Sequence, residues 1–180
     1  MPIKDVETPY PVIDKDPHFF RVVRYFRPTD YAAWAVGTAA APAILLGFAW
    51  ETASERIPKL TTSHEKMNPS GPAKAMKGPL KIAGLIGAFG GFLYAYQKSS
   101  LRFWGWEENV SEVEKDKAEM QQRIADGKPL YGDSQLSPYL QSVSSANSKN
   151  AQLKFSAIPW FNFANHDNHG VDASKYNETQ

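Results

Sequence analysis

Residues 31–50 read YAAWAVGTAAAPAILLGFAW and carry no formal charge over twenty positions, between Asp30 and Glu51. At about 1.5 Å of rise per residue, a helix of this length spans roughly 30 Å, the thickness of a bilayer's hydrocarbon core. The alternative is the core helix of a soluble protein, but such helices rarely run this long without a polar face. The stretch therefore predicts a transmembrane helix over 31–50.

The composition of this helix predicts its contacts. Trp34 and Trp50 lie towards its two ends, where amphipathic rings favour the headgroup layer, so we expect both to be interface anchors. Pro42 removes one backbone hydrogen bond and predicts a bend. The first half is rich in alanine and glycine, which let helices approach closely. Gly37 and Ala40 are therefore predicted packing contacts.

A second apolar run, IAGLIGAFGGFLYAYQ at residues 82–97, is also uncharged. Sixteen residues give only about 24 Å, so Lys81 and Lys98 would have to extend their ammonium groups to the two interfaces. Apolar residues continue on both sides, and we predict a second transmembrane helix over 80–103. Its small residues permit close helix contact, and the predicted packing positions are Gly84, Gly87 and Gly91.

The composition excludes several classes of function. The net charge is +1 and no long basic block occurs, so nucleic acid is not an expected partner. The chain has no cysteine, which excludes disulfides, thiolate metal sites and cysteine-ligated iron–sulfur clusters. The first twenty residues resemble neither a secretory signal nor an Arg-rich transit peptide, so we expect any organelle address to be internal.

The N-terminal segment 1–30 is predicted to be an extended arm, because four prolines interrupt its first part. It ends in a short basic and aromatic segment, FFRVVRYFR at 19–27. Such a segment suits a membrane interface, with its guanidinium groups at the lipid phosphates. Arg21, Arg24 and Arg27 are therefore expected interface anchors.

The polar segment 51–79 is predicted to be a Pro-rich connection between the two spans. Two spans place both termini on the same side of the membrane. Lysines and arginines are nearly equal in number in this loop and on the outer flanks, so charge does not assign the side.

The segment 104–180 is predicted to be a polar C-terminal region. Trp104 and Trp106 follow the second span and are expected interface anchors. A charged helix is predicted over about 109–126, started by an Asn109–Glu112 capping pair and presenting one narrow apolar contact face.

Beyond this helix, residues 131–150 are rich in Ser, Gln and Asn and are expected to be irregular. The aromatic residues between 155 and 163 are expected to dock on a neighbouring protein, because the chain offers no large core. The predicted fold is thus an all-α membrane protein with two transmembrane helices, an extended arm and a mostly irregular tail containing one charged helix.

Candidate catalytic and metal-binding residues are few. His166 and His169 flank Asp167 and could begin a zinc site. Three-residue spacing works best on a helix, however, and the surrounding Asn and Gly residues disfavour one. We therefore expect an exposed polar tail, with no metal site, no cofactor-binding site and no catalytic residue.

Four segments together resemble a known family. They are YPVIDKDPHF at 10–19, VVRYFRPTDY at 22–31, WGWEEN at 104–109 and the tail IPWFNFANHDNHGVD at 158–172. They are similar to the fungal 21 kDa subunit of mitochondrial NADH:ubiquinone oxidoreductase, respiratory complex I. The resemblance implies a non-catalytic accessory subunit in the inner mitochondrial membrane, with other complex I subunits and lipids as partners.

Two further hypotheses stay open at this point. The glycine-rich second span loosely resembles helices of inner-membrane preprotein translocases or small carriers, although these need more spans. The chain could also be a soluble or monotopic enzyme whose apolar runs form its core.

Overall fold

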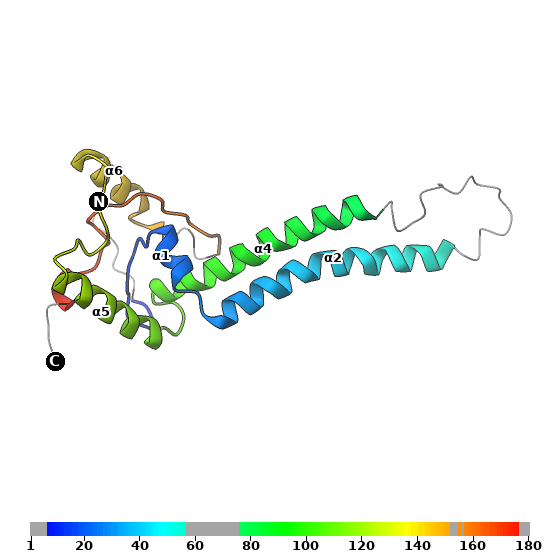
Figure 1. Ribbon diagram of the computed structural model, residues 1–180, viewed down its shortest axis with the longest axis horizontal. Helices are drawn as coiled ribbons and strands as arrows, with labels where there is room; N and C mark the ends of the chain where they lie inside the picture. Colours follow the sequence, from blue (N-terminus) through cyan, green and yellow to red (C-terminus); the bar gives the residue numbers. More distant parts are fainter. Residues whose placement is uncertain (1–6, 57–75, 152–154, 156, 177–180) are drawn as a thin grey trace. The chain divides into compact units, whose positions relative to one another are not determined.

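The computed structural model describes residues 7–56, 76–151, 155 and 157–176, and most of these residues are helical (Figure 1). Most of the predicted connection 51–79 lies outside the described residues. No strand forms within the described ranges, where one isolated parallel bridge joins His18 to Asn162. The predicted all-α class is confirmed. The helices are α1 (Phe19–Arg24), α2 (Pro28–Arg56), α4 (Lys77–Phe103), α5 (Val110–Ala125), α6 (Pro138–Ser148) and the 3-10 helix η2 (Ala173–Tyr176).

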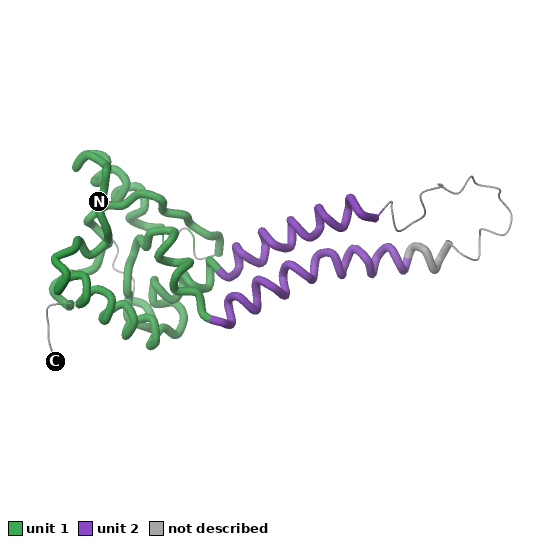
Figure 2. Tube along the Cα trace, in the orientation of Figure 1, with its two compact units in different colours: residues 1–27, 96–180 green, residues 28–95 purple. Residues whose placement is uncertain are grey.

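The chain divides into two compact units (Figure 2). Unit 1 contains residues 1–27 and 96–180, so it is built from both ends of the chain. Unit 2 contains residues 28–95. Helix α4 therefore begins in unit 2 and ends in unit 1.

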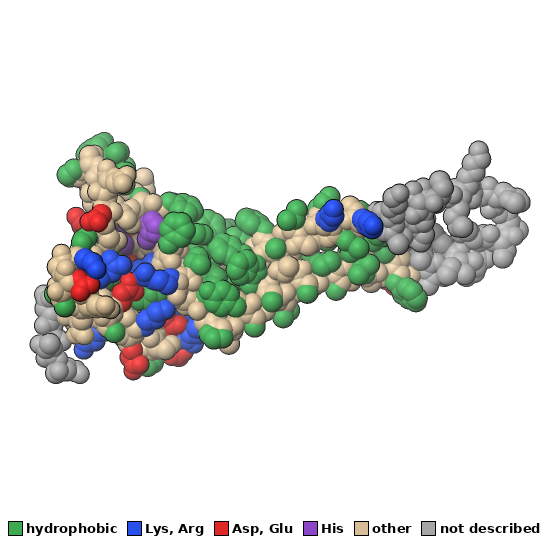
Figure 3. Space-filling view, viewed as in Figure 1, with side chains coloured by type: hydrophobic (Ala, Val, Ile, Leu, Met, Phe, Trp, Pro, Cys, Tyr) green, Lys and Arg blue, Asp and Glu red, His purple; other side chains and the backbone are tan. Residues whose placement is uncertain are grey.

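Unit 2 consists of apolar helices with exposed side chains. Pro28–Glu51 and Lys77–Phe103 are each long and apolar enough to cross a membrane. No residue in the apolar window of the first helix is buried within the chain, and Phe48 is 63% exposed. Hydrophobic side chains cover much of the visible face of unit 2 (Figure 3). A soluble core helix would bury these side chains, so the helices fit a membrane environment as predicted.

Glycines bring α2 and α4 together inside unit 2. A Cβ built on Gly87 would lie 2.7 Å from the carbonyl oxygen of Gly37. One built on Gly91 would lie 2.7 Å from the carbonyl oxygen of Trp34. Neither position has room for a side chain, so glycine is required for this close approach. Gly37, Gly87 and Gly91 therefore lie at a contact between the chain's own two helices.

Trp34 belongs to this helix contact. Its Nε1 donates a hydrogen bond to the carbonyl oxygen of Ala88 at 2.8 Å. Its ring meets that of Phe92 edge-on at a centroid distance of 5.4 Å. The side chain that was expected to anchor the helix among lipid headgroups is thus held against the partner helix.

In unit 1, the N-terminal arm lies on its own chain. The backbone N–H groups of Tyr10 and Ile13 donate to the carbonyl oxygens of Gly105 and Phe103, at 3.1 and 3.0 Å. Gly105 has a φ of 76°, and a Cβ there would collide with the carbonyl group of Tyr10. Only glycine fits at this position. The arm is therefore an integral part of the fold of unit 1.

The core of unit 1 forms around the end of α4. Trp104 is 1% exposed and lies within this core, so the expectation that it anchors the chain at a membrane surface is wrong. The indole is largely apolar, so it can be buried in a protein core. Fully or almost fully buried apolar side chains are Ile13, Val22, Tyr25, Tyr96, Phe103 and Met120.

Helix α6 corrects the expectation that residues 131–150 are irregular. The helix runs over Pro138–Ser148, and the Ser137 side chain caps it by accepting a hydrogen bond from the N–H of Leu140. Serine at the N-cap followed by proline at the first helical position is a strong start signal. The many Ser and Asn residues in this segment are typical of irregular structure, which is why the sequence alone did not indicate the helix.

The aromatic tail also departs from expectation, because it packs on the end of α4 within unit 1. The ring of Phe161 lies 4.7 Å from that of Tyr96, whose hydroxyl donates to the carbonyl oxygen of Trp160 at 3.2 Å. Gln97 Nε2 donates to the carbonyl oxygen of Phe155 at 2.8 Å. The docking surface for these residues is therefore their own chain.

A buried polar network as the candidate functional site

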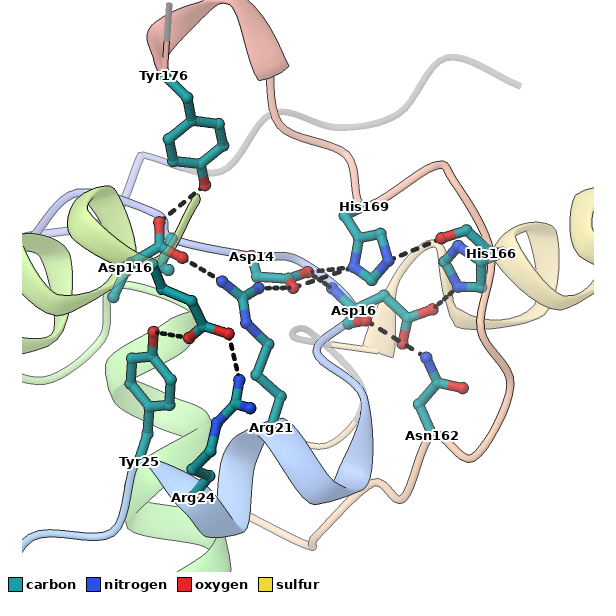
Figure 4. A network of polar contacts seen from close by, with 12 residues as sticks. Asp14, Asp16, Arg21, Arg24, Tyr25, Asp116, Asn162, His166, His169 and Tyr176 are labelled. Carbon is teal, nitrogen blue, oxygen red and sulfur yellow. Dashed lines mark hydrogen bonds and ion pairs between the residues drawn. The ribbon is translucent and has the colours of Figure 1, made fainter. Parts of the chain in front are cut away.

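Asp14 is the centre of a buried polar network in unit 1 (Figure 4). The arm places it there, because the N–H groups of Ile13 and Asp14 both donate to the carbonyl oxygen of Phe103. The Asp14 carboxylate accepts a hydrogen bond from Arg21 Nη1 at 2.7 Å. Its other oxygen lies 2.8 Å from Nδ1 of His169. One carboxylate thus joins the arm, α1 and the C-terminal segment.

Arg21 links Asp14 to α5. Its second terminal nitrogen donates to Asp116, and the hydroxyl of Tyr176 donates to the same carboxylate at 2.7 Å. Arg21 is only 8% exposed, so its expected position at lipid phosphates is wrong. A buried guanidinium needs paired anions, and two carboxylates from distant segments supply them.

Asp16 organises a second branch of the network. Its Oδ2 lies 2.6 Å from Nε2 of His166 and accepts a hydrogen bond from the Ser148 hydroxyl at the end of α6. Its backbone carbonyl accepts from Asn162 Nδ2 at 3.3 Å. This branch fixes α6 and the residues before His166 against the arm.

The two histidines are buried, contrary to the expected exposed tail. His166 is 2% exposed and His169 is 4% exposed. The ring of Tyr131 stacks on His169 at 3.6 Å, and Nε2 of His169 lies 2.8 Å from the carbonyl oxygen of His166. Spacing within NHDNHG could not indicate this, because the partners Asp14 and Asp16 lie some 150 residues earlier. Among the described residues, no group of three or more His, Cys, Asp or Glu side chains could hold a metal ion.

Burial and ion pairing have opposite effects on the pKa values of the acidic groups in this network. Burial alone would raise the pKa of Asp14, but His169 and Arg21 outweigh it and lower that pKa below its ordinary value. Burial raises the pKa of Asp116 despite the attraction of Arg21. Burial, together with the negative charge of Asp14, raises the pKa of Tyr131 to about 12. The network therefore favours the charged form of Asp14.

An acidic face of α5 receives the three arginines that follow one another at three-residue intervals. Arg21 pairs with Asp116, Arg24 with Glu119, and Arg27 with Glu112. The acids occupy one side of the helix because their spacing is four and three residues. Arg24 and Arg27 thus face α5, not a lipid phosphate.

The start of α5 differs from the predicted capping pair. Asn109 Nδ2 donates to the carbonyl oxygens of Pro11 and Arg102, both at 2.7 Å. The N–H of Val110 instead donates to Glu108 Oε1 at 2.9 Å. Asn109 therefore ties the arm to α4, and Glu108 caps α5.

The contact face of α5 is mainly acidic, although a narrow apolar stripe was expected. Met120 is buried, but Ile124 is 42% exposed. Glu112 is 4% exposed and pairs with Arg102 at 3.1 Å as well as with Arg27. The complementary charge spacing of the two segments was the signal that could have revealed this face.

The remaining predicted contacts lie outside the network. A Cβ on Gly84 would meet nothing within 4 Å, and Ala40 is partly exposed. Trp50 is 80% exposed near the end of α2, whereas Trp106 is partly exposed in unit 1. Their roles as packing contacts or interface anchors stay predictions.

The network is suited to holding segments together. Its carboxylates, guanidinium groups and imidazoles are paired with one another across the arm, α1, α5 and the C-terminal segment. A cavity of about 470 Å³ adjoins it between α6 and the loop that carries the histidines. The cavity is lined by, among others, Lys15, Asp16, Ser145, Lys149 and His166.

The comparisons with known proteins agree along most of the chain. Residues 7–108 match the family described as "NADH-ubiquinone oxidoreductase complex I, 21 kDa subunit". Residues 117–180 match the family described as the C-terminal part of that 21 kDa subunit. The 20.9 kDa subunit of NADH-ubiquinone oxidoreductase from Neurospora crassa is 43% identical over 174 residues, which cover 96% of this chain and 84% of the relative.

The two matched regions fold together. Asp14 and Arg21 belong to the first region, whereas His169 and Tyr176 belong to the second. The buried network joins them in unit 1. From these matches and this identity, we conclude that the chain belongs to the family of the 21 kDa subunit of NADH-ubiquinone oxidoreductase, complex I.

Proposed function

We propose that this chain is a non-catalytic accessory subunit of the membrane region of complex I in the inner mitochondrial membrane. In this role it supports assembly or stability through its apolar helices and its arm. The observation that carries the proposal is that the buried ionisable groups of unit 1 serve to hold the protein together. They pair with one another to join distant segments, and α2 and α4 leave large apolar side chains exposed.

The folding of unit 1 supports a particular topology. Residues 7–27 and 96–176 share one network, so both flanks of the helix pair must lie in the same compartment if α2 and α4 each cross the membrane. Both termini are then on the same side. The partners in this proposal are other complex I subunits and membrane lipids, with no nucleic acid.

Native electrophoresis of mildly solubilised mitochondrial membranes tests the assignment. We expect mass spectrometry to recover this chain in the band that contains the core subunits of complex I. Recovery with preprotein translocase components, or migration alone at small mass, would overturn the proposal. The first of these outcomes would favour the translocase alternative.

A second experiment separates an accessory role from a catalytic one. In a strain that lacks this chain, we expect less assembled complex I, measured as flavin-containing complex on native gels. The NADH:ubiquinone turnover per assembled complex should be unchanged, and equal in strains that carry the wild-type chain and in strains that carry Arg21→Met. A normal amount of complex with reduced turnover would contradict the accessory role.

A further inference from the structure

An aromatic cluster lies where the arm, the tail and α4 meet in unit 1. We define it as Phe19, Phe20, Tyr96, Phe161 and Phe163. We propose that its exposed rings, Phe20 and Phe163, insert into the boundary between headgroups and acyl chains of the bilayer. The inference rests on α4 crossing the membrane, as the proposed function requires.

Backbone contacts hold the cluster together. The N–H of Phe19 donates to the carbonyl oxygen of Asn162 at 2.7 Å, beside the bridge between His18 and Asn162. The Phe19 ring then stacks on Tyr96 at 5.3 Å and lies 4.8 Å from Phe163. The position of both phenylalanines is therefore fixed relative to one residue of α4.

The outer rings of the cluster face away from the protein. Phe20 meets Phe19 edge-on at 5.3 Å but is 67% exposed. Phe163 is 64% exposed. Both rings contact Phe19, and leaving two such phenylalanine rings in water is unfavourable because their apolar area stays hydrated. The arrangement indicates that another apolar medium covers them.

The position of Tyr96 along α4 identifies that medium as lipid. Residues 82–97 carry no charge, and Lys98 is the first charged residue after them. Tyr96 is therefore at the end of the apolar run, where a spanning helix passes from hydrocarbon to headgroups. Phe19 packs on Tyr96, and Phe20 and Phe163 both pack on Phe19, which places the cluster near this depth. This is the layer that aromatic rings prefer.

The charges near the cluster strengthen the argument. Arg21 and Arg24 follow Phe20 in the sequence but pair with Asp116 and Glu119 of α5. Both basic side chains of α1 are therefore engaged by acids of α5, with Arg21 buried and Arg24 half-exposed, while Phe20 stays exposed. The contact with lipid that we propose is therefore made by the aromatic rings.

The absence of cysteine allows single spin labels to test this inference in the full-length chain. We would label Phe20→Cys and Phe163→Cys in phosphatidylcholine vesicles and compare collisions with oxygen, which partitions into lipid, and with a water-soluble nickel chelate. Phe89→Cys, in the apolar run of α4, is the lipid control. Gln122→Cys, on the exposed side of α5, is the water control.

We expect labels at Phe20 and Phe163 to collide with oxygen several-fold more readily than with nickel, as the Phe89 label does. If the labels at positions 20 and 163 behave like the Gln122 label while the Phe89 label reports lipid, this inference is overturned, but the proposed membrane crossing by α4 is retained. If the Phe89 label itself reports water, the proposed membrane span fails.

A photoreactive phenylalanine at position 163 tests the same surface in assembled complex I. Cross-links to phospholipid would support insertion of the ring into the bilayer. Cross-links to another subunit would overturn it, because the aromatic surface would then be a protein interface.

Discussion

His169 Nδ1 lies 2.8 Å from Asp14 Oδ1, although 155 residues separate the two side chains in the sequence. Together with Arg21, this pair closes unit 1 around the end of α4. The arm and the C-terminal segment therefore depend on each other, and the following predictions test that dependence.

Replacing Arg21 should destabilise unit 1 far more than replacing Arg24. Arg21→Met leaves Asp14 and Asp116 buried without their cation, at a cost of about 3–5 kcal/mol. Arg24→Met removes a side chain that is 52% exposed, where an ion pair contributes about 0–1 kcal/mol. Urea unfolding in mild detergent, followed by tryptophan fluorescence, to which the buried Trp104 contributes, measures both. Equal shifts of the two midpoints would contradict the proposed importance of the buried pair.

Adding a single methyl group at Gly87, as in Gly87→Ala, should destabilise the contact between α2 and α4. A Cβ there would lie 2.7 Å from the carbonyl oxygen of Gly37, and such overpacking costs about 1–3 kcal/mol. At Gly90 a Cβ meets nothing within 4 Å, so Gly90→Ala should be neutral or stabilising by up to about 1 kcal/mol. Thermal loss of helical circular dichroism in detergent compares the variants. A Gly87→Ala variant as stable as Gly90→Ala would rule out the close approach.

Acid should weaken unit 1. The folded-state pKa values of Asp14, Glu112 and Glu119 lie below their ordinary values of 3.8, 4.5 and 4.5. Each group therefore contributes stability above its unfolded pKa and loses it as the pH falls through the folded pKa. Asp116, whose pKa is raised, acts in the opposite direction but is one group against three. We expect the urea midpoint to fall between about pH 5 and pH 3.

A variant provides the control for this pH dependence. In Asp14→Asn the side chain at position 14 no longer titrates, so the acid-dependent fall of the urea midpoint should become shallower. An unchanged slope would show that Asp14 does not contribute to it.

Removing the C-terminal segment should release the arm. A chain that ends at Ala151 lacks His166, His169 and Tyr176, and we expect trypsin to cleave it faster after Lys15 and Arg21. A chain that ends at Tyr176 keeps every described contact and is the matched control. Mass spectrometry of the early fragments measures the sites, and equal cleavage rates would argue against mutual support of the two ends.

The long apolar helices could be predicted from sequence because their signal is local. Few structures other than a membrane-spanning helix accommodate an uncharged run of twenty residues. The structure places helices over Pro28–Arg56 and Lys77–Phe103. The start signal of α6, Ser137 before Pro138, is equally local. The Ser, Gln and Asn residues around it favour irregular structure, so composition and capping point in opposite directions in this segment.

The candidate site could not be predicted in the same way, because its pairs are remote. Asp14, Arg21 and His169 each appear exposed and polar when they are considered alone. Folding pairs each of the three arginines with an acid of α5 that lies 85 to 95 residues later in the sequence. The spacing within each segment indicates a charged face, but it does not identify which residue of the other segment is the partner.

The construction of unit 1 from both ends of the chain determines the order of its folding. During synthesis, residues 7–27 are made long before Asp116 and His169. The arm therefore stays hydrated while both apolar helices are synthesised. Closing such a long loop is slow relative to forming local helices. Asp14 can lose its water only after the last tenth of the chain has arrived, so unit 1 cannot close before both helices have been synthesised.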